Sequence, residues 1–132
     1  MKEPMVFEAG EGRLRITLAV WETGGNGLSC TVTGGQLPHV GGMALASLSP
    51  RLEGGGDTCD LWTSCVPGHK DAILAQQLAK RLCVATRQPV AMTVGVHVDG
   101  ASPEEIETLC RHCRRAVDQY LSGQETGGKE SR

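Results

Sequence analysis

Apolar side chains alternate with smaller or polar ones between positions 90 and 98, and this is the most regular pattern in the chain. The alternating residues are Val90, Met92, Val94, Val96 and Val98. Successive side chains of a β-strand point to opposite faces of the sheet, so a period of two predicts a strand with one buried face. His97 and Asp99 fall on the opposite face. The segment therefore predicts a core strand whose end carries polar side chains.

Four further strands are expected before this one. Residues 13–23 alternate in the same way, and residues 28–33 follow after a glycine-rich turn, which predicts a β-hairpin. Residues 43–48 and 58–64 have the composition of two more strands. Because consecutive strands joined by short connections usually pair, we expect these four strands to form an antiparallel meander.

The apolar period lengthens to that of a helix in two segments. The first helix is expected over about residues 69–86. Ser102 and Glu105 have the spacing of a capping box, with Pro103 at the first helical position, so a second helix should begin there and end near Leu121. The order of elements predicts an α+β fold: an antiparallel meander followed by helix, strand and helix, with the helices covering one sheet face.

One domain over residues 1–121 accounts for all of these elements. Residues 122–132 carry no apolar side chain, so ordering them would cost entropy without burying any surface, and we expect a flexible tail. Aromatic residues make up only 3% of the chain. The core must therefore consist of aliphatic side chains, Met and Cys, with Trp21 and Trp62 expected inside it.

The charge balance excludes several classes of partner. The formal net charge is −2, which gives no general attraction for phosphate backbones or anionic lipids. No segment approaches the roughly 20 apolar residues that span a bilayer, and the first residues do not resemble a signal peptide. We therefore expect a cytoplasmic protein with no nucleic-acid or membrane partner.

The six cysteines are expected to stay reduced, because thiols persist in the cytoplasm. Cys110 and Cys113 form a CxxC pair, but no second pair lies at zinc-finger spacing. Both fall on the apolar stripe of the second predicted helix, so we expect them to pack inward as small apolar residues.

Three polar clusters lie at joints between the predicted elements. The first is the loop at 34–42, in which glycines let the backbone approach a ligand closely and can leave amides free to bind it. This loop has neither a Walker ending nor a GxGxxG pattern, which argues against nucleotide hydrolysis and a Rossmann fold. A flexible connection is the alternative. Its candidate binding residues are Gly35, Pro38, His39 and Gly41.

The second cluster, at 67–71, precedes the first predicted helix. Amides and the positive dipole end at a helix start favour an anion, and Lys70 adds a full charge, so a phosphate fits there. An exposed lysine and a first-turn carboxylate are the alternative reading of the same residues. The candidates for ligand contact are His69, Lys70 and Asp71, with Arg51 as a further cation.

The third cluster is at 95–100, where His97 and Asp99 either contact a ligand or simply pair with each other. His39, His69 and His97 could also hold a metal ion if their loops converge. No GxSxG or SxxK pattern supports a nucleophile, and Cys65 near His69 is the nearest candidate.

The three clusters in this order, Gly-Gly-Gln-Leu-Pro-His-Val-Gly-Gly, Pro-Gly-His-Lys-Asp and Gly-Val-His-Val-Asp-Gly, resemble the LpdD-like family over roughly residues 7–121. The resemblance implies a non-enzymatic chaperone with a fold similar to proteasome assembly chaperones. It implies prenylated flavin mononucleotide (FMN), or FMN, as the cofactor carried, with a metal ion at the flavin phosphate as a further possibility.

The implied partner is a UbiD-type (de)carboxylase, since the founding member of the family accompanies gallate decarboxylase. A flavin prenyltransferase is a further partner to consider. We also expect a homo-oligomer, because exposed edges in a small open sheet invite pairing. The alternatives are a protein-assembly module without a cofactor and a small enzyme that uses a metal or a cysteine.

Overall fold

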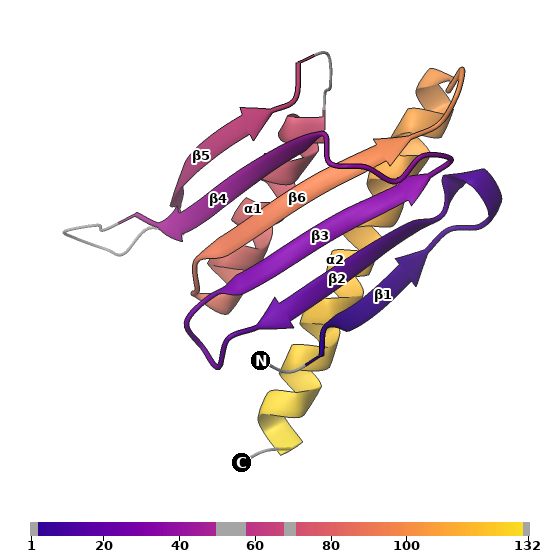
Figure 1. Cartoon of the computed structure of the whole chain (residues 1–132). Coiled ribbons are helices and arrows are strands. Elements are labelled where there is room, and N and C mark those ends of the chain that lie inside the picture. Colours follow the sequence, from indigo (N-terminus) through magenta and orange to yellow (C-terminus); the bar gives the residue numbers. More distant parts are fainter. Residues whose placement is uncertain (1–2, 50–57, 68–70, 131–132) are drawn as a thin grey trace.

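The computed structural model describes residues 3–49, 58–67 and 71–130. The elements follow one another as β1 (Met5–Ala9), η1 (Gly12–Leu14), β2 (Ile16–Glu22), β3 (Leu28–Gly35), β4 (Gly42–Leu48), β5 (Cys59–Cys65), α1 (Asp71–Thr86), β6 (Val90–His97) and α2 (Pro103–Glu130) (Figure 1). Every predicted strand and helix has a counterpart here. Strand β1 and the short turn η1 are additions that the sequence pattern did not indicate.

All six strands belong to one mixed sheet in the order β1-β2-β3-β6-β4-β5. This confirms the α+β class, but the strand order differs from a continuous meander. β6 lies between β3 and β4, parallel to β3 and antiparallel to β4. The reason is that α1 returns the chain to the middle of the sheet, where the most apolar strand becomes buried on one face and paired along both edges.

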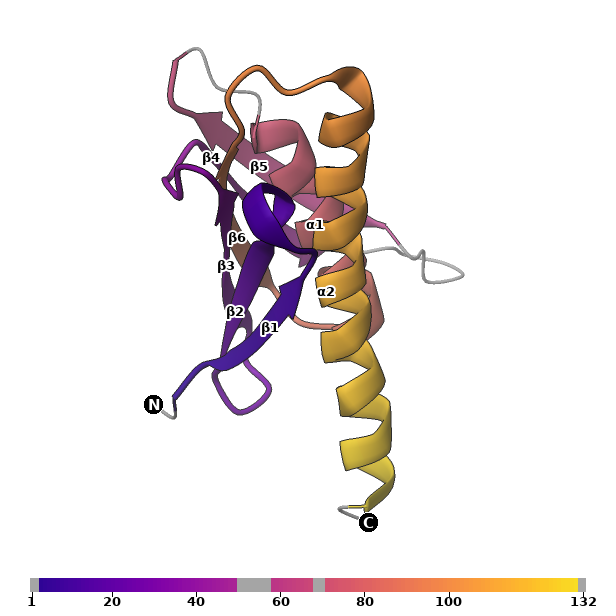
Figure 2. The same ribbon diagram turned by 90° about the vertical axis from the view of Figure 1, so that its right-hand side faces the viewer.

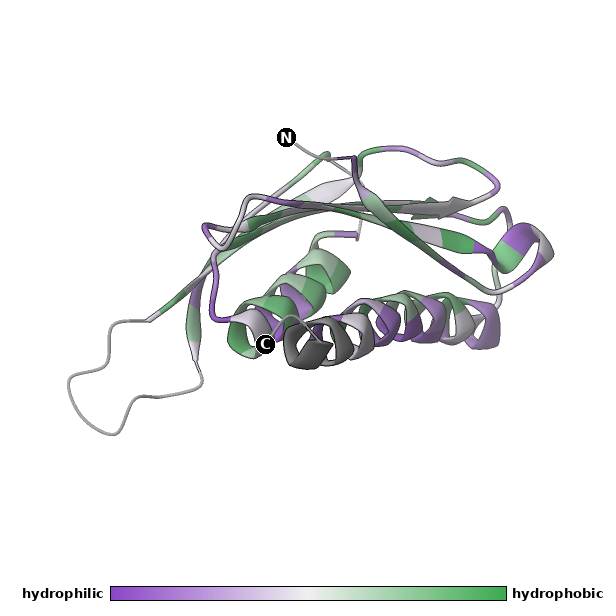
Figure 3. Ribbon diagram, turned by 90° about the horizontal axis from the view of Figure 1, so that it is seen from below, coloured by the Kyte–Doolittle hydropathy of each residue, from purple (hydrophilic) through white to green (hydrophobic). Residues whose placement is uncertain are grey.

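Both helices lie against the same face of the sheet, as expected (Figure 2). α1 packs on β4, β5 and β6, whereas α2 packs on β1 and β2. The sheet and α1 both carry many hydrophobic residues (Figure 3), and buried residues of both belong to one core cluster. Among the described residues, no helix combines the length and apolar character needed to span a membrane.

The core consists of aliphatic side chains, as the scarcity of aromatic residues predicts. Ile16, Leu18 and Val20 of β2 and Val90, Met92 and Val94 of β6 are completely buried. Each fully buried side chain of this size contributes about 1.5–3 kcal/mol. Tyr120 of α2 is also buried and meets Phe7 edge-on, with ring centroids 5.9 Å apart.

Helix α2 begins with the predicted capping box. The hydroxyl of Ser102 accepts a hydrogen bond from the Glu105 amide, and the Glu105 carboxylate accepts one from the Ser102 amide, each at 3.1 Å. The helix continues past the expected end at Leu121 to Glu130. Helix propagation adds one backbone hydrogen bond per residue, so polar residues can prolong a helix that packing has already nucleated. The flexibility of residues 122–132 stays a prediction.

The opposite face of the sheet is not covered by a helix (Figure 2). Met43 and Leu45 alternate with buried Ala44 and Ala46, so they point to this open face and are 45% and 42% exposed. Trp62 lies directly opposite Leu45 in the register and is 57% exposed. The expectation that Trp62 belongs to the core is therefore wrong, because β5 is an edge strand and this side chain points away from α1.

Candidate functional site

A pocket lies where β6 ends, between α1 and α2, with a volume of about 310 Å³. Its polar lining residues are His39, Asp71 and His97. The other lining residues are apolar or carry thiols: Leu74, Val96, Val98, Ala101, Ile106, Leu109, Cys110 and Cys113. The fold therefore brings residues of all three predicted clusters to one apolar hollow.

His39 and Asp71 form the central polar contact of this pocket. Nε2 of His39 lies 3.2 Å from Oδ2 of Asp71, and Nδ1 lies 2.8 Å from the Leu37 carbonyl oxygen. Each ring nitrogen of His39 therefore faces an oxygen atom of the protein. Both side chains are largely buried, with 17% and 13% exposure.

Asp71 also connects α1 to β6. Its Oδ1 accepts a hydrogen bond from the Val96 amide at 3.3 Å. One carboxylate in the first turn of α1 thus contacts both the loop after β3 and the central strand. The prediction of a first-turn carboxylate is confirmed, and the structure shows which elements it joins.

The loop after β3 crosses the end of β6, and β6 engages its amides. The Gln36 amide donates to the His97 carbonyl at 2.7 Å, the His39 amide to that of Gly95 at 3.4 Å, and the Gly41 amide to that of Val94 at 2.9 Å. The prediction that this loop offers free amides to an anion is therefore wrong for these three groups. Their hydrogen bonds fix the loop as a wall of the pocket.

Three glycines permit this close approach. A Cβ at Gly95 would overlap the His39 carbonyl, and one at Gly41 would overlap the Asp71 carboxylate. Gly35 has a φ of 73°, which favours glycine, and a Cβ there would overlap the His97 carbonyl. These glycines therefore allow the loop after β3, β6 and the start of α1 to pack closely together. The sequence had suggested that such glycines make room for a ligand.

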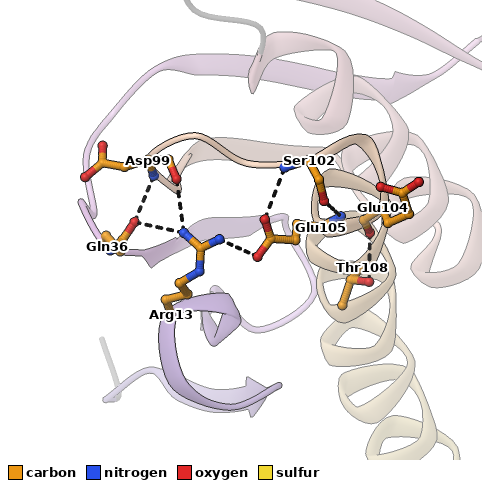
Figure 4. A network of polar contacts seen from close by, with 7 residues as sticks. All are labelled: Arg13, Gln36, Asp99, Ser102, Glu104, Glu105 and Thr108. Carbon is orange, nitrogen blue, oxygen red and sulfur yellow. Dashed lines mark hydrogen bonds and ion pairs between the residues drawn. The ribbon is translucent and has the colours of Figure 1, made fainter.

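A polar network fixes the neighbouring loops from outside (Figure 4). Arg13 donates to the carbonyl oxygen of Asp99 at 3.0 Å and forms an ion pair with Glu105, while the Asp99 amide donates to Oε1 of Gln36 at 2.8 Å. The backbone hydrogen bond from Ser102, followed by the contact with Arg13, lowers the pKa of the Glu105 carboxyl. The sequence did not indicate Arg13, because its partners Asp99 and Glu105 lie 86 and 92 residues further along the chain.

The remaining predicted site residues are distributed as follows. His97 borders the pocket and its Nε2 pairs with Asp99 at 2.9 Å, while its contact with a ligand stays a prediction. Pro38 is exposed in the loop and does not line the pocket. Arg51, His69 and Lys70 lie outside the described residues. Within the described ranges, no three His, Cys, Asp or Glu side chains group as metal ligands.

The two pocket thiols are poor nucleophiles at neutral pH. Burial, and secondarily the neighbouring Cys110, raise the pKa of Cys113 to about 12. Burial also raises the pKa of the half-buried Cys110 thiol. The expectation that this CxxC pair faces inward is thus confirmed for Cys113, whereas Cys110 lies in the pocket wall.

A larger hollow of about 660 Å³ lies at the opposite end of the sheet, beside the β2–β3 turn. Its lining comes mainly from turn glycines and polar side chains, including Gln88 and Gln124. Ligand pockets are mostly apolar with a few convergent polar groups, which describes the hollow at the end of β6 much better. We therefore take that pocket as the candidate site.

Most of the chain matches one known protein family. Residues 10–125 match the prenylated flavin chaperone LpdD-like domain. The chain belongs to this LpdD-like family. No curated protein matches this LpdD-like chain at a significant level.

Among solved structures, this LpdD-like chain is similar to a chain from the crystal structure of a novel chaperone complex for yeast 20S proteasome assembly. The TM-score is 0.56 at 12% sequence identity, over 94% of this chain and 95% of the other. At this identity the similarity concerns the fold alone. The expected likeness to proteasome assembly chaperones is confirmed.

Proposed function

We propose that this protein binds prenylated FMN, or FMN, without transforming it, and assists the maturation of a UbiD-type (de)carboxylase. The observation that carries the proposal is the family match over residues 10–125, in a chain that has an apolar pocket lined from all three predicted clusters. A cytoplasmic location, with a flavin prenyltransferase as the source of the cofactor, is part of the same proposal.

The pocket suits part of such a cofactor. A prenylated flavin combines a flat ring system with added isoprenoid carbons, and the pocket wall offers aliphatic side chains from α1, β6 and α2. Leu74, Val96 and Leu109 would exclude water from an apolar group. His39 and Asp71 supply a polar contact that could orient it. No metal is needed for this role, and a metal at the flavin phosphate stays a proposal.

The low reactivity of the candidate nucleophiles supports binding of the cofactor without a catalysed reaction. The two thiols of the pocket are held protonated at neutral pH by burial. Cys65 is exposed at the end of β5 and is not among the lining residues, while His69 lies outside the described residues. Catalysis by a cysteine thus has less support than binding.

A protein partner is supported by exposed apolar side chains near the pocket. Ile106, which lines the pocket, is 51% exposed, and Leu37 and Val40 on either side of His39 are 59% and 62% exposed. Contiguous exposed apolar groups mark interaction sites. We propose that the client decarboxylase docks at this end, so that the cofactor passes between the proteins without crossing bulk water.

We also propose that the protein forms a homodimer through the open sheet face. The described strand residues that point to this face from β2, β3, β6 and β4 include no Asp, Glu, Lys or Arg. A second copy can therefore meet the middle of this face without juxtaposing like charges, because the carboxylates that share the face, Glu8 and Asp60, belong to the edge strands β1 and β5. The same face supports the alternative function, a protein-assembly module without a cofactor.

The proposed function is tested by purifying the protein after co-expression with a flavin prenyltransferase. A visible flavin spectrum that persists through gel filtration is the expected result. The matched control is co-expression with an inactive prenyltransferase. Protein that never retains flavin, and an apo-decarboxylase that matures equally fast with and without it, would overturn the chaperone role and favour the assembly module.

A further inference from the structure

We infer that the pocket takes the prenylated ring system of the flavin and that the phosphate stays outside the pocket. This inference rests on the proposed function and states which part of the cofactor the protein encloses. It differs from the usual expectation that a helix start attracts the phosphate.

The volume supports this division. An apolar cavity of roughly 150 Å³ is enough to bind benzene. The pocket, at about 310 Å³, is about twice as large and accommodates a multi-ring apolar group. Pockets for complete drug-sized ligands run from about 300 to 1,000 Å³, so this one is at the lower limit. The volume therefore matches the ring system better than the ring together with its ribityl phosphate chain.

The charges of the lining residues also oppose a phosphate in the pocket. Asp71 brings a carboxylate that is only 13% exposed, and a phosphate beside it would face like charge with little solvent screening. The two groups that can be cationic, His39 and His97, each contact a carboxylate, of Asp71 and Asp99 respectively. The Gln36, His39 and Gly41 amides of the adjoining loop already donate to β6. In the part of the chain that the structure describes, the lining therefore offers poor donors for a dianion.

The apolar side of the pocket favours an uncharged, apolar part of the ligand. Leu74 of α1, Val96 of β6, Val98 just after β6 and Leu109 of α2 surround one hollow. Removing apolar surface from water favours binding, and this gain is specific to the part of the ligand that is enclosed. The added isoprenoid carbons increase that surface. The pocket should thus favour a prenylated flavin over an unmodified one.

Cys110 provides a direct readout of occupancy. Its thiol lies in the pocket wall and is half-buried, so a small alkylating reagent can reach it. Cys59 is also half-buried, but it does not line the pocket. It is the first residue of β5 and pairs with Leu48 in the register. Bound ring should slow alkylation of Cys110 and leave Cys59 unchanged. Mass spectrometry of the two peptides measures both rates in one sample.

The decisive comparison uses prenylated FMN, FMN and their dephosphorylated forms as ligands. Removing the phosphate should change the dissociation constant by less than about threefold, whereas a phosphate held by charged donors would contribute at least about tenfold. Both prenylated forms should protect Cys110. Asp71→Asn should change the affinities for the phosphorylated and dephosphorylated ligands by the same factor.

Two helix variants locate the ring. Ile106→Trp places a larger side chain in the pocket from an exposed position in the first turn of α2. It should weaken the binding of prenylated ligands at least about tenfold. Ile73→Trp is the control, because Ile73 is 61% exposed in the first turn of α1 and does not line the pocket. Equal effects of the two variants, or a phosphate effect above tenfold, would overturn the inference while flavin binding stands. No binding of any flavin would overturn the proposed function itself.

Discussion

The imidazole of His39 lies 3.2 Å from the carboxylate of Asp71, and this contact joins the loop after β3 to the first turn of α1. The other carboxylate oxygen holds the Val96 amide of β6. Three elements that are distant in sequence are thus connected through one largely buried side chain. The polar wall of the pocket is therefore preorganised before any ligand arrives.

Replacing Asp71 by Ala should lower the free energy of unfolding by about 2–3 kcal/mol, because it removes two hydrogen bonds to a largely buried charge. Urea denaturation measures the change. The control is Asp99→Ala, whose side chain is 80% exposed and should cost less than about 1 kcal/mol. Similar losses in the two variants would contradict the structural role of Asp71.

Gly95→Ala should be among the most destabilising small substitutions in the chain. The added methyl group would overlap the backbone carbonyl of His39, so the loop must move away from β6. We expect a loss of at least about 2 kcal/mol together with weaker protection of the Gly41 amide in hydrogen exchange. Gly123→Ala is the matched control, since no atom lies near its Cβ, and it should be neutral or stabilise α2 by up to about 1 kcal/mol.

Acid should remove the contribution of Glu105 to stability. The hydrogen bond from Ser102 and the contact with Arg13 lower the pKa of this carboxyl in the folded state from about 4.5. Its ionised form therefore stabilises the fold above the unfolded pKa, and this contribution is lost as the pH falls through the lower folded pKa.

Glu105→Gln, which keeps the capping hydrogen bond but not the charge, isolates this effect. The variant should melt below the wild type near neutral pH, and the two Tm values should converge as the pH falls through the lowered folded pKa of Glu105. Glu107→Gln, at a 62% exposed position, is the control. A difference in Tm that does not depend on pH would count against the charge effect.

The six thiols should react in an order set by burial. Cys65 is exposed and should react first, followed by the half-buried Cys59 and Cys110. Burial raises the pKa of Cys30 to about 12 and, with a smaller effect of Cys59, that of Cys83 to about 11, so both stay protonated at pH values near 8. Together with Cys113 they should react only on unfolding. Timed alkylation with mass spectrometry tests this order, and a native disulfide would refute it.

Leu45→Asp should dissociate the proposed homodimer, because it places a charge opposite Trp62 in the middle of the exposed apolar cluster on the open face. Sedimentation velocity should show dimer for the wild type and monomer for the variant. Ile73→Asp, on the helical side of the molecule, should leave the dimer intact. A wild-type protein that remains monomeric at high concentration would sink the proposal.

Much of the local structure could be predicted from the sequence. The alternation over 90–98 predicted β6, the capping box predicted the start of α2 with both of its hydrogen bonds, and the three clusters identified the family. Each of these patterns depends on residues that are close in the chain. In the site, the same reasoning selected His39, Asp71 and His97, which do line one pocket.

Apart from β1 and η1, the sequence by itself determined where strands and helices form and which of their faces are apolar, because periodicity records burial directly. Only the tertiary structure decided that β6 enters the middle of the sheet, since periodicity does not specify a strand's neighbours. It likewise decided that Asp71 holds His39, that Arg13 reaches Glu105, and that β6 carbonyls engage the loop amides. These contacts join residues far apart in the chain, and only packing of the helices on one sheet face brings them together.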